Sequence, residues 1–140
     1  MFLSNGQLFA QVEDPVDWNF TAKKMANNQY EVHLTANVSG NWHIYSQDCG
    51  KGPEPTSISF LKNPLIKLQG KVNEIGKLET QYDPNFKSTL KFYNKQVDFV
   101  QKISKKSKAS TILKGTVTFM VCNERKCLPP KDVPFSVKID

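Results

Sequence analysis

Residues 30–38 read Tyr-Glu-Val-His-Leu-Thr-Ala-Asn-Val, and apolar and polar side chains alternate strictly along them. A period of two places every second residue on the same face of a β-strand. The apolar face of this segment is formed by Tyr30, Val32, Leu34, Ala36 and Val38. A turn follows at residues 39–41, so the segment predicts a strand with one buried face that turns back into a second strand.

The rest of the chain repeats this kind of signal. Further strands are predicted at residues 42–46, 56–61, 65–68, 91–93, 96–103, 112–122 and 133–138. We expect 112–122 to be the longest strand, residues 94–95 to be a turn, and residues 82–86 to be an irregular loop. No segment has the periodicity of an amphipathic helix. About eight short strands with turns between them predict an all-β fold, an immunoglobulin-like antiparallel β-sandwich.

Length and composition indicate one globular domain. The chain has 140 residues, of which 39% are hydrophobic and 23% are charged. We expect the domain to span residues 13–140. We expect residues 1–12 to be a disordered tail or a signal-peptide remnant, because Leu8-Phe9-Ala10-Gln11 resembles the end of a secretory signal. No apolar run approaches the ~18 residues of a membrane-spanning helix.

The charge pattern argues against a nucleic-acid partner. The net charge is +6, but it comes from scattered lysines, and Arg125 is the only arginine. A nucleic-acid surface would need a basic stripe with arginines or stacking aromatics on one face. A lysine-rich solvated surface fits better, and an acidic protein partner stays open.

A cysteine pair stands at the end of the strand predicted at 112–122. Cys122 and Cys127 are separated by four residues, and two prolines follow shortly after the second cysteine. The arrangement predicts a disulfide at the tip of a hairpin-like turn. Bridging so short a loop stabilises a fold by only about 2 kcal/mol in the entropy model, which favours a redox role over bracing. A zinc site would need more ligands, and the remaining candidates are poorly spaced: Cys49, His33 and His43.

The loop between the cysteines is basic, with Arg125 and Lys126 against Glu124. Nearby positive charge favours a thiolate, which is the nucleophile in thiol–disulfide exchange. An ordinary stabilising disulfide in a secreted protein also fits the spacing. The alternative function is therefore a secreted β-sandwich that binds a protein or glycan and carries a purely structural disulfide.

Three segments carry a family resemblance. They are residues 40–46 (Gly-Asn-Trp-His-Ile-Tyr-Ser), residues 92–99 (Phe-Tyr-Asn-Lys-Gln-Val-Asp-Phe), and residues 115–130, where a strand enters the first cysteine and prolines follow the second. Over most of residues 14–139 the chain resembles the N-terminal periplasmic domain of DsbD-type thiol:disulfide interchange proteins, also known as the disulfide bond corrector domain family. The resemblance implies an immunoglobulin-like fold.

The resemblance also implies a function. The family relays reducing equivalents from a membrane-embedded partner domain to thioredoxin-like periplasmic proteins, such as disulfide isomerases and factors of cytochrome c maturation. For this chain it implies a periplasmic location, the activity of a protein-disulfide reductase or of a domain of one, and no metal or other cofactor. The chain is either a domain of a longer membrane protein or a stand-alone relative.

Site residues follow from the resemblance as well. Cys122 and Cys127 would be the redox pair, with Cys127 forming the mixed disulfide and Cys122 resolving it. Tyr82 or Phe86 would be the shielding ring of a cap loop. The aromatic positions near the site would be Trp42 and Tyr45.

The chain departs from the family pattern in three respects. The loop between the cysteines is one residue shorter, Leu128 stands where an aromatic follows the second cysteine, and Cys49 has no counterpart. A changed loop bears on the strain of the bridge, its reduction potential and the choice of partner.

Overall fold

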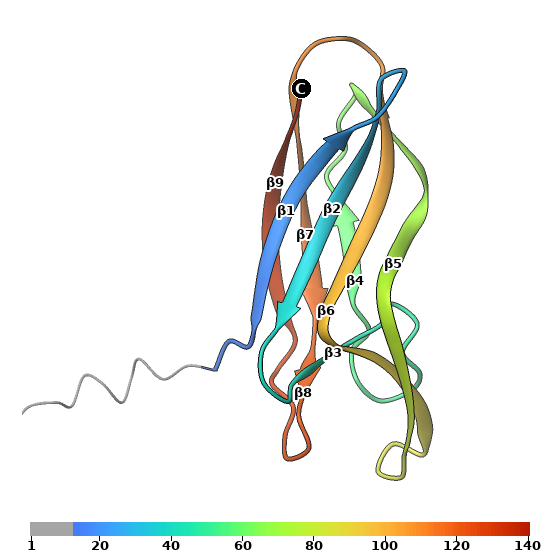
Figure 1. Ribbon diagram of the computed structural model, residues 1–140, viewed down its shortest axis with the longest axis vertical. Coiled ribbons are helices and arrows are strands. Elements are labelled where there is room, and N and C mark those ends of the chain that lie inside the picture. The colour runs from blue at the N-terminus through green and yellow to red at the C-terminus, as the bar shows by residue number, and fades with distance from the viewer. Residues whose placement is uncertain (1–12) are drawn as a thin grey trace, which may run out of the picture.

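The computed structural model describes residues 13–140, and the tail expected at residues 1–12 lies outside the described residues (Figure 1). Among the described residues there are nine strands and no helix. The strands are β1 (Val16–Lys24), β2 (Gln29–Val38), β3 (His43–Tyr45), β4 (Ser57–Phe60), β5 (Ile66–Asp83), β6 (Ser88–Lys105), β7 (Thr111–Phe119), β8 (Val121–Cys122) and β9 (Lys131–Ile139).

The strands form two antiparallel sheets. The larger has the order β1-β2-β6-β3-β8, and β5 pairs with the other edge of β6. Along β6, residues 96–104 pair with β2 and residues 92–94 pair with β3. The smaller sheet has the order β4-β7-β9. The predicted all-β, immunoglobulin-like sandwich is confirmed.

A main core fills the space between the sheets. In β2 every second residue from Tyr30 to Val38 is buried, as the alternation predicts. Phe99 of β6 lies opposite Leu34, and both are fully buried. The main core consists of Val16, Tyr30, Val32, Leu34, Ala36, Val38, Trp42, Ile44, Ile66, Tyr93, Val97, Phe99, Ile103, Leu113, Phe119, Val121, Phe135, Val137 and Ile139.

Two predictions about strand length were wrong. The longest strands are β5 and β6 with 18 residues each, whereas the predicted run 112–122 is divided into β7 and β8. The turn predicted at Asn94-Lys95 is an irregularity inside β6, where Lys95 has a φ of 66°. The pairing with β5 slips at the same level, between Gly76 and Leu78. A local left-handed residue therefore marks a β-bulge here rather than a chain reversal.

β5 was predicted only in part, and β1 was not predicted. β5 continues through residues 71–83, so Tyr82 and Asp83 of the loop expected at residues 82–86 belong to the strand, and only residues 84–86 lie in the turn into β6. β5 pairs only with β6 and is largely exposed, so it lacks the alternation that burial of one face produces. β1 does alternate, with its more buried positions at Val16, Trp18, Phe20 and Ala22.

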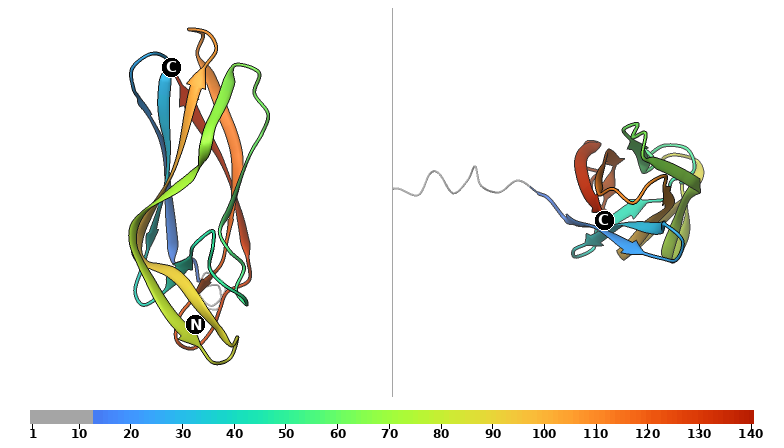
Figure 2. Two further views of the ribbon diagram at one scale, coloured as in Figure 1. Left: turned by 90° about the vertical axis from the view of Figure 1, so that its right-hand side faces the viewer. Right: turned by 90° about the horizontal axis from the view of Figure 1, so that it is seen from above.

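The turn between β5 and β6 and the turn after β8 lie at the same end of the molecule, at the bottom in Figure 1 and in the left view of Figure 2. The end of β9 lies at the opposite end. Within residues 13–140, no helix of a length and apolarity suited to crossing a membrane was found. The candidate functional site lies at the lower end of the sandwich in Figure 1.

Candidate functional site: a disulfide in an aromatic cleft

A short hairpin carries the two cysteines. β8 ends at Cys122, and a turn over residues 123–126 leads to Cys127. Asn123 closes the turn, because its side-chain oxygen accepts hydrogen bonds from the amides of Arg125 (2.8 Å) and Lys126 (2.9 Å). The disulfide joins Cys122 to Cys127. Below it, the Leu128 amide donates to the Val121 carbonyl at 3.0 Å.

The two sulfur-bearing residues differ in exposure. Cys122 is buried, with 3% of its surface accessible, whereas Cys127 is exposed. Cys122 ends a strand that is paired with β3, and Cys127 stands on the outer arm of the hairpin. An incoming thiolate therefore meets Cys127 before Cys122.

Strand β3 lies between β8 and β6 and places aromatic groups beside the disulfide. His43 is the direct partner of Cys122, and Tyr45 is the partner of Phe92. The imidazole of His43 packs on the Phe92 ring, with 4.3 Å between ring centroids. Its Nε2 shares a hydrogen bond of 3.0 Å with the Tyr45 hydroxyl. Burial raises the pKa of Tyr45 to about 12, helped by Asp83 and Cys49, and burial lowers the pKa of His43.

Tyr45, Phe92 and Cys122 belong to a second apolar group, which we call the small cluster: Tyr45, Cys49, Leu90, Phe92 and Cys122. Their chain neighbours Ile44, Tyr93 and Val121 belong to the main core. Because side chains alternate between the faces of a strand, the small cluster lies on the opposite face of the same strands. The disulfide therefore sits outside the main core, on an apolar patch of its own.

The β5–β6 turn faces the disulfide hairpin across an open cleft of about 420 Å³. Tyr82 and Phe86 line the cleft, and both are substantially exposed, at 59% and 40%. The turn is held by Asp83, whose Oδ1 accepts hydrogen bonds from the amides of Asn85 (2.8 Å) and Phe86 (3.3 Å). Together the two turns form the walls of one site, and His43, Tyr45 and Phe92 contribute to the same lining.

The loop over residues 46–56 packs against the ring of Phe86. Gly52 has a φ of 126°, and a Cβ there would lie 2.3 Å from a ring carbon of Phe86. Only glycine combines this backbone angle with such close contact by a ring. The same loop is tied to β6, where the Lys91 amide donates to the Cys49 carbonyl at 3.0 Å. The loop and the β5–β6 turn are thus fitted to each other.

Cys49 sits inside that loop and has 2% of its surface exposed. Its thiol donates weakly to the carbonyls of Gly50 and Pro53, at 3.6 Å each. Burial raises the pKa of this thiol, although a backbone hydrogen bond opposes the effect. Cys49 is a buried free thiol within the small cluster.

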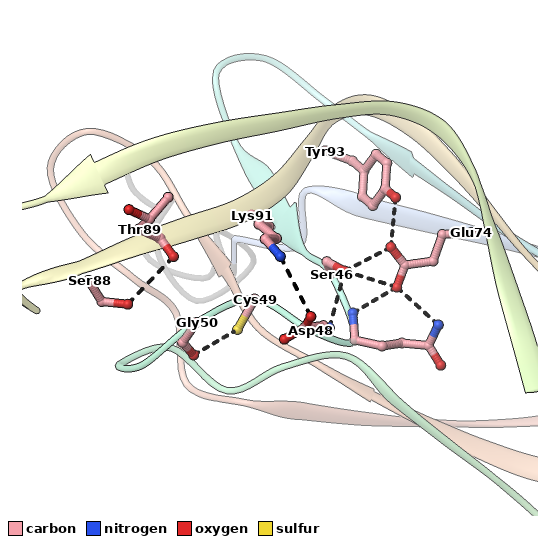
Figure 3. Close-up of polar contacts among 10 residues, drawn as sticks. Ser46, Asp48, Cys49, Gly50, Glu74, Ser88, Thr89, Lys91 and Tyr93 are labelled. Carbon is pink, nitrogen blue, oxygen red and sulfur yellow. Dashed lines mark hydrogen bonds and ion pairs between the residues drawn. The ribbon is translucent and has the colours of Figure 1, made fainter.

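A carboxylate anchors the loop to β5 (Figure 3). Glu74 accepts hydrogen bonds from the Tyr93 hydroxyl (2.6 Å), the Ser46 hydroxyl (2.8 Å), and the Gln47 amide (2.7 Å) and side chain (3.0 Å). Burial by itself would raise the pKa of Glu74, but these hydrogen bonds lower it. Burial and the Glu74 carboxylate raise the pKa of Tyr93. The ionised form of Glu74 is therefore the one that this network holds.

The sequence-predicted residues are brought together with one exception. Cys122, Cys127, Tyr82, Phe86 and Tyr45 all line the cleft. The exception is Trp42, which is 8% exposed and belongs to the main core. Among the described residues, no group of three or more His, Cys, Asp or Glu side chains is placed to hold a metal ion.

The cleft residues that were not predicted include His43, Leu90 and Phe92. The sequence offered His43 only as a poorly spaced metal ligand. The usable signal was its alternation with Ile44 and Tyr45, which places His43 and Tyr45 on one face. Nothing local in the sequence shows that this face meets Cys122, because that contact depends on strand pairing.

The immunoglobulin-like sandwich carries a disulfide between an exposed and a buried cysteine, and this disulfide is set in an aromatic cleft. This is the arrangement of a thiol–disulfide exchange domain. The family model described as thiol:disulfide interchange protein DsbD, N-terminal, matches residues 10–138. The chain belongs to this family, as the resemblance implied. A comparison with curated protein sequences found no match.

Two solved structures share the fold. The N-terminal periplasmic domain of ScsB from Proteus mirabilis has a TM-score of 0.60 and 18% identity, and the alignment covers 91% of this chain and 47% of that one. The reduced form of the Neisseria meningitidis DsbD N-terminal domain has a TM-score of 0.54 and 16% identity, with 84% and 82% covered. This chain thus spans about half of the ScsB structure. At such identities the likeness extends to the fold.

Proposed function

We propose that Cys122 and Cys127 form a redox pair through which this chain relays reducing equivalents by thiol–disulfide exchange. The observation that carries the proposal is the unequal exposure of the two cysteines within one aromatic cleft. Membership in the DsbD N-terminal family supports it. Exchange needs one sulfur that a partner can reach, and a second sulfur close to it can then resolve the mixed disulfide.

The chemistry divides into a loading and a delivery reaction. In loading, the thiolate of a reduced partner attacks Sγ of Cys127, the disulfide breaks, and Cys122 leaves as a thiolate that takes up a proton. The partner's second thiolate then attacks the partner's first sulfur, which is bonded to Cys127 in the mixed disulfide, and Cys127 is released. Two electrons and two protons have passed to the pair, and the partner carries the new disulfide.

Delivery runs the same steps outward. The Cys127 thiolate attacks a client disulfide, and Cys122 then attacks Sγ of Cys127, releasing the reduced client. Arg125 and Lys126 lie in the turn beside Cys127 and favour its thiolate. The pair is reoxidised and ready for another cycle.

The β5–β6 turn acts as a cap in this proposal. Phe86 and Tyr82 line the cleft that holds the disulfide, and Phe86 rests on Gly52. In the proposal these rings screen the side of the disulfide that faces the cleft, and a docking partner displaces them as it engages Cys127. This limits exchange outside a complex.

The finer assignments rest on the family. We propose that residues 13–140 act as one immunoglobulin-like redox domain in the periplasm, which is where the ScsB domain is located. The electron donor would be a membrane-embedded thiol:disulfide exchange domain, and the clients would be thioredoxin-like periplasmic proteins. The activity would be that of a protein-disulfide reductase or of a domain of one.

The reduction potential of the pair tests the proposal. It is measured by trapping thiols in defined redox buffers, in a Cys49→Ala background so that only the pair titrates. A value between those of thioredoxin and glutaredoxins, about −270 to −200 mV, with rapid exchange against a thioredoxin-like protein, is expected. A potential below about −300 mV without exchange would make the bridge structural and favour a binding module.

A further inference from the structure

His43 is the feature of the cleft that the relay as described leaves without a task. Its strand partner on one side is Cys122, and directly opposed residues of antiparallel strands have Cβ atoms about 4.5–5.5 Å apart on the same face. Both residues line the cleft, which confirms that they share this face. The imidazole is half-buried and packs on Phe92, so its ring is held in place.

Cys122 needs a base in the delivery reaction. It is buried among Tyr45, Leu90 and Phe92, and a thiol in such an apolar setting keeps its proton because the thiolate loses its hydration. Only the thiolate attacks a disulfide efficiently. A proton acceptor at the buried sulfur would therefore speed the step in which Cys122 displaces the client.

We propose that the imidazole of His43 takes the proton of the Cys122 thiol as that sulfur attacks the mixed disulfide on Cys127. The inference rests on the proposed function. The Cys122–Cys127 bond forms, the bond between Cys127 and the client breaks, and the client sulfur leaves as a thiolate. The imidazolium of His43 then gives its proton to that thiolate. The client disulfide has been reduced by two electrons, and the pair has been oxidised.

Tyr45 sets the ring for this role. In the proposal Nε2–H donates to the Tyr45 hydroxyl at 3.0 Å, which leaves the lone pair of Nδ1 free to accept a proton. Among residues 13–140, Nε2 is the only nitrogen of this ring with a hydrogen-bond partner. Burial lowers the pKa of His43, so the neutral, basic form predominates at neutral pH.

The other titratable or charged groups facing this cleft are less suited to the task. They are Tyr45 on β3, Tyr82 and Asp83 on β5, and Glu124, Arg125 and Lys126 on the disulfide hairpin. Cys49 of the adjoining loop lies behind the cleft lining in the small cluster, and burial raises the pKa of its thiol. Burial raises the pKa of Tyr45, so its hydroxyl keeps its proton. Tyr82 is exposed on the far wall of the cleft, and the side chains of Arg125 and Lys126 carry donors but no acceptor. Asp83 is engaged by two amides of its own turn, and Glu124 is exposed at the hairpin tip. β6 contributes apolar Leu90 and Phe92.

The test follows one turnover with oxidised glutathione as the disulfide substrate. Reduced protein in the Cys49→Ala background is mixed with the probe and quenched in acid at intervals. Mass spectrometry then separates the reduced protein, the glutathione adduct and the internal disulfide. The decay of the adduct gives the rate of the Cys122 step. The variant is His43→Gln. The matched control is His33→Gln, which removes a histidine of β2 that is held by Glu31 and by Asp98 of β6.

His43→Gln is expected to slow the decay of the adduct by about 100-fold at neutral pH, the lower end of the range for general base catalysis. The deficit should shrink as pH rises, because hydroxide then deprotonates Cys122 without help. His33→Gln should behave like the parent. Equal rates and equal pH profiles for His43→Gln and the parent would overturn the role of His43 while leaving the relay intact. A parent protein that forms neither adduct nor internal disulfide would instead overturn the relay.

Tyr45→Phe provides a second route if His43→Gln does not fold. It keeps the ring in the small cluster and removes only the hydroxyl that orients His43. We expect an intermediate slowing, with a pH profile displaced from that of the parent. An unchanged rate and profile would contradict the proposed orientation and the role built on it.

Discussion

The main core and the small cluster are built on the same strands but on opposite faces. In β3, Ile44 points to the main core and Tyr45 to the small cluster, and in β6 the same holds for Tyr93 and Phe92. The main core is closed by the second sheet. The small cluster is bordered by a loop and a turn that meet where Phe86 contacts Gly52.

This difference separates stability from chemistry. A core closed by a sheet can be opened only by unfolding, since every strand that covers it is paired along its length. A cluster bordered by a loop and a turn can be exposed by local motion at much lower free energy. The Cys122–Cys127 pair lies on the second kind of surface, where a partner can gain access while the sandwich stays folded.

The sharpest test of this division is Cys127→Ala. It should abolish thiol–disulfide exchange, because the exposed sulfur that partners reach is gone. The fold should survive, since a bridge across so short a loop contributes about 2 kcal/mol at most. Exchange is measured with a thioredoxin-like protein and stability by urea unfolding. Residual exchange at the parent rate would show that Cys122 alone carries the chemistry.

Leu34→Ala attacks the main core instead. Leu34 is fully buried opposite Phe99, so its truncation should lower the free energy of unfolding by about 2–5 kcal/mol. The matched variant Leu90→Ala in the small cluster should fall at the lower end of that range, because the loop and turn can settle into the space. Urea unfolding of both variants measures the difference. A larger loss for Leu90→Ala would reverse the proposed division.

Phe86→Ala probes the cap. Removing the ring should let dithiothreitol reduce the Cys122–Cys127 bridge several-fold faster, because the cleft loses part of its screen. Ile75→Ala is the control, since Ile75 is an exposed apolar side chain of β5, outside the cleft lining. Reduction is followed by timed thiol trapping. Equal rates for Phe86→Ala and the parent would remove Phe86 from the cap.

Glu74→Gln should have the smallest effect, visible in the pH dependence of stability. The folded state lowers the pKa of Glu74, so its contribution is present above the ordinary pKa of a glutamate and is lost as pH falls through the lowered value. Replacement by glutamine should therefore flatten the fall in unfolding free energy on acidification. Urea unfolding at neutral and acidic pH measures this. Glu79→Gln, at an exposed pair with Lys77, is the control, and an unaltered slope for Glu74→Gln would contradict the expectation.

Local patterns in the sequence predicted the elements that bury one face. The alternation from Tyr30 to Val38 gave β2 and the sandwich class, and the cysteine spacing pointed to a bridged turn. β5 was largely missed because an exposed edge strand has no buried face to leave a pattern. The bulge at Lys95 was taken for a turn, since both use the same left-handed backbone.

The site was harder to predict than the fold. The cap residues Tyr82 and Phe86 came from the family resemblance, and their place in the cleft depends on how β5 and β6 pair. His43 could not be assigned to the cleft, because its contact with Cys122 joins residues far apart in the chain. Local alternation fixes the face on which a residue lies but not which distant strand lies opposite it, and both contacts depend on that pairing.

The reactivity of Cys49 can report how often the cleft opens. Its thiol is buried within the same loop as Gly52, which contacts Phe86, so we expect an alkylating reagent to reach it only when that loop opens. The alkylation rate of Cys49, divided by the rate for a free thiol, therefore gives the fraction of folded molecules in which the loop is open. A docked partner that displaces the cap would raise the alkylation rate of Cys49, and one that holds the loop closed would lower it. The chain thus reports on its own gate without an added label.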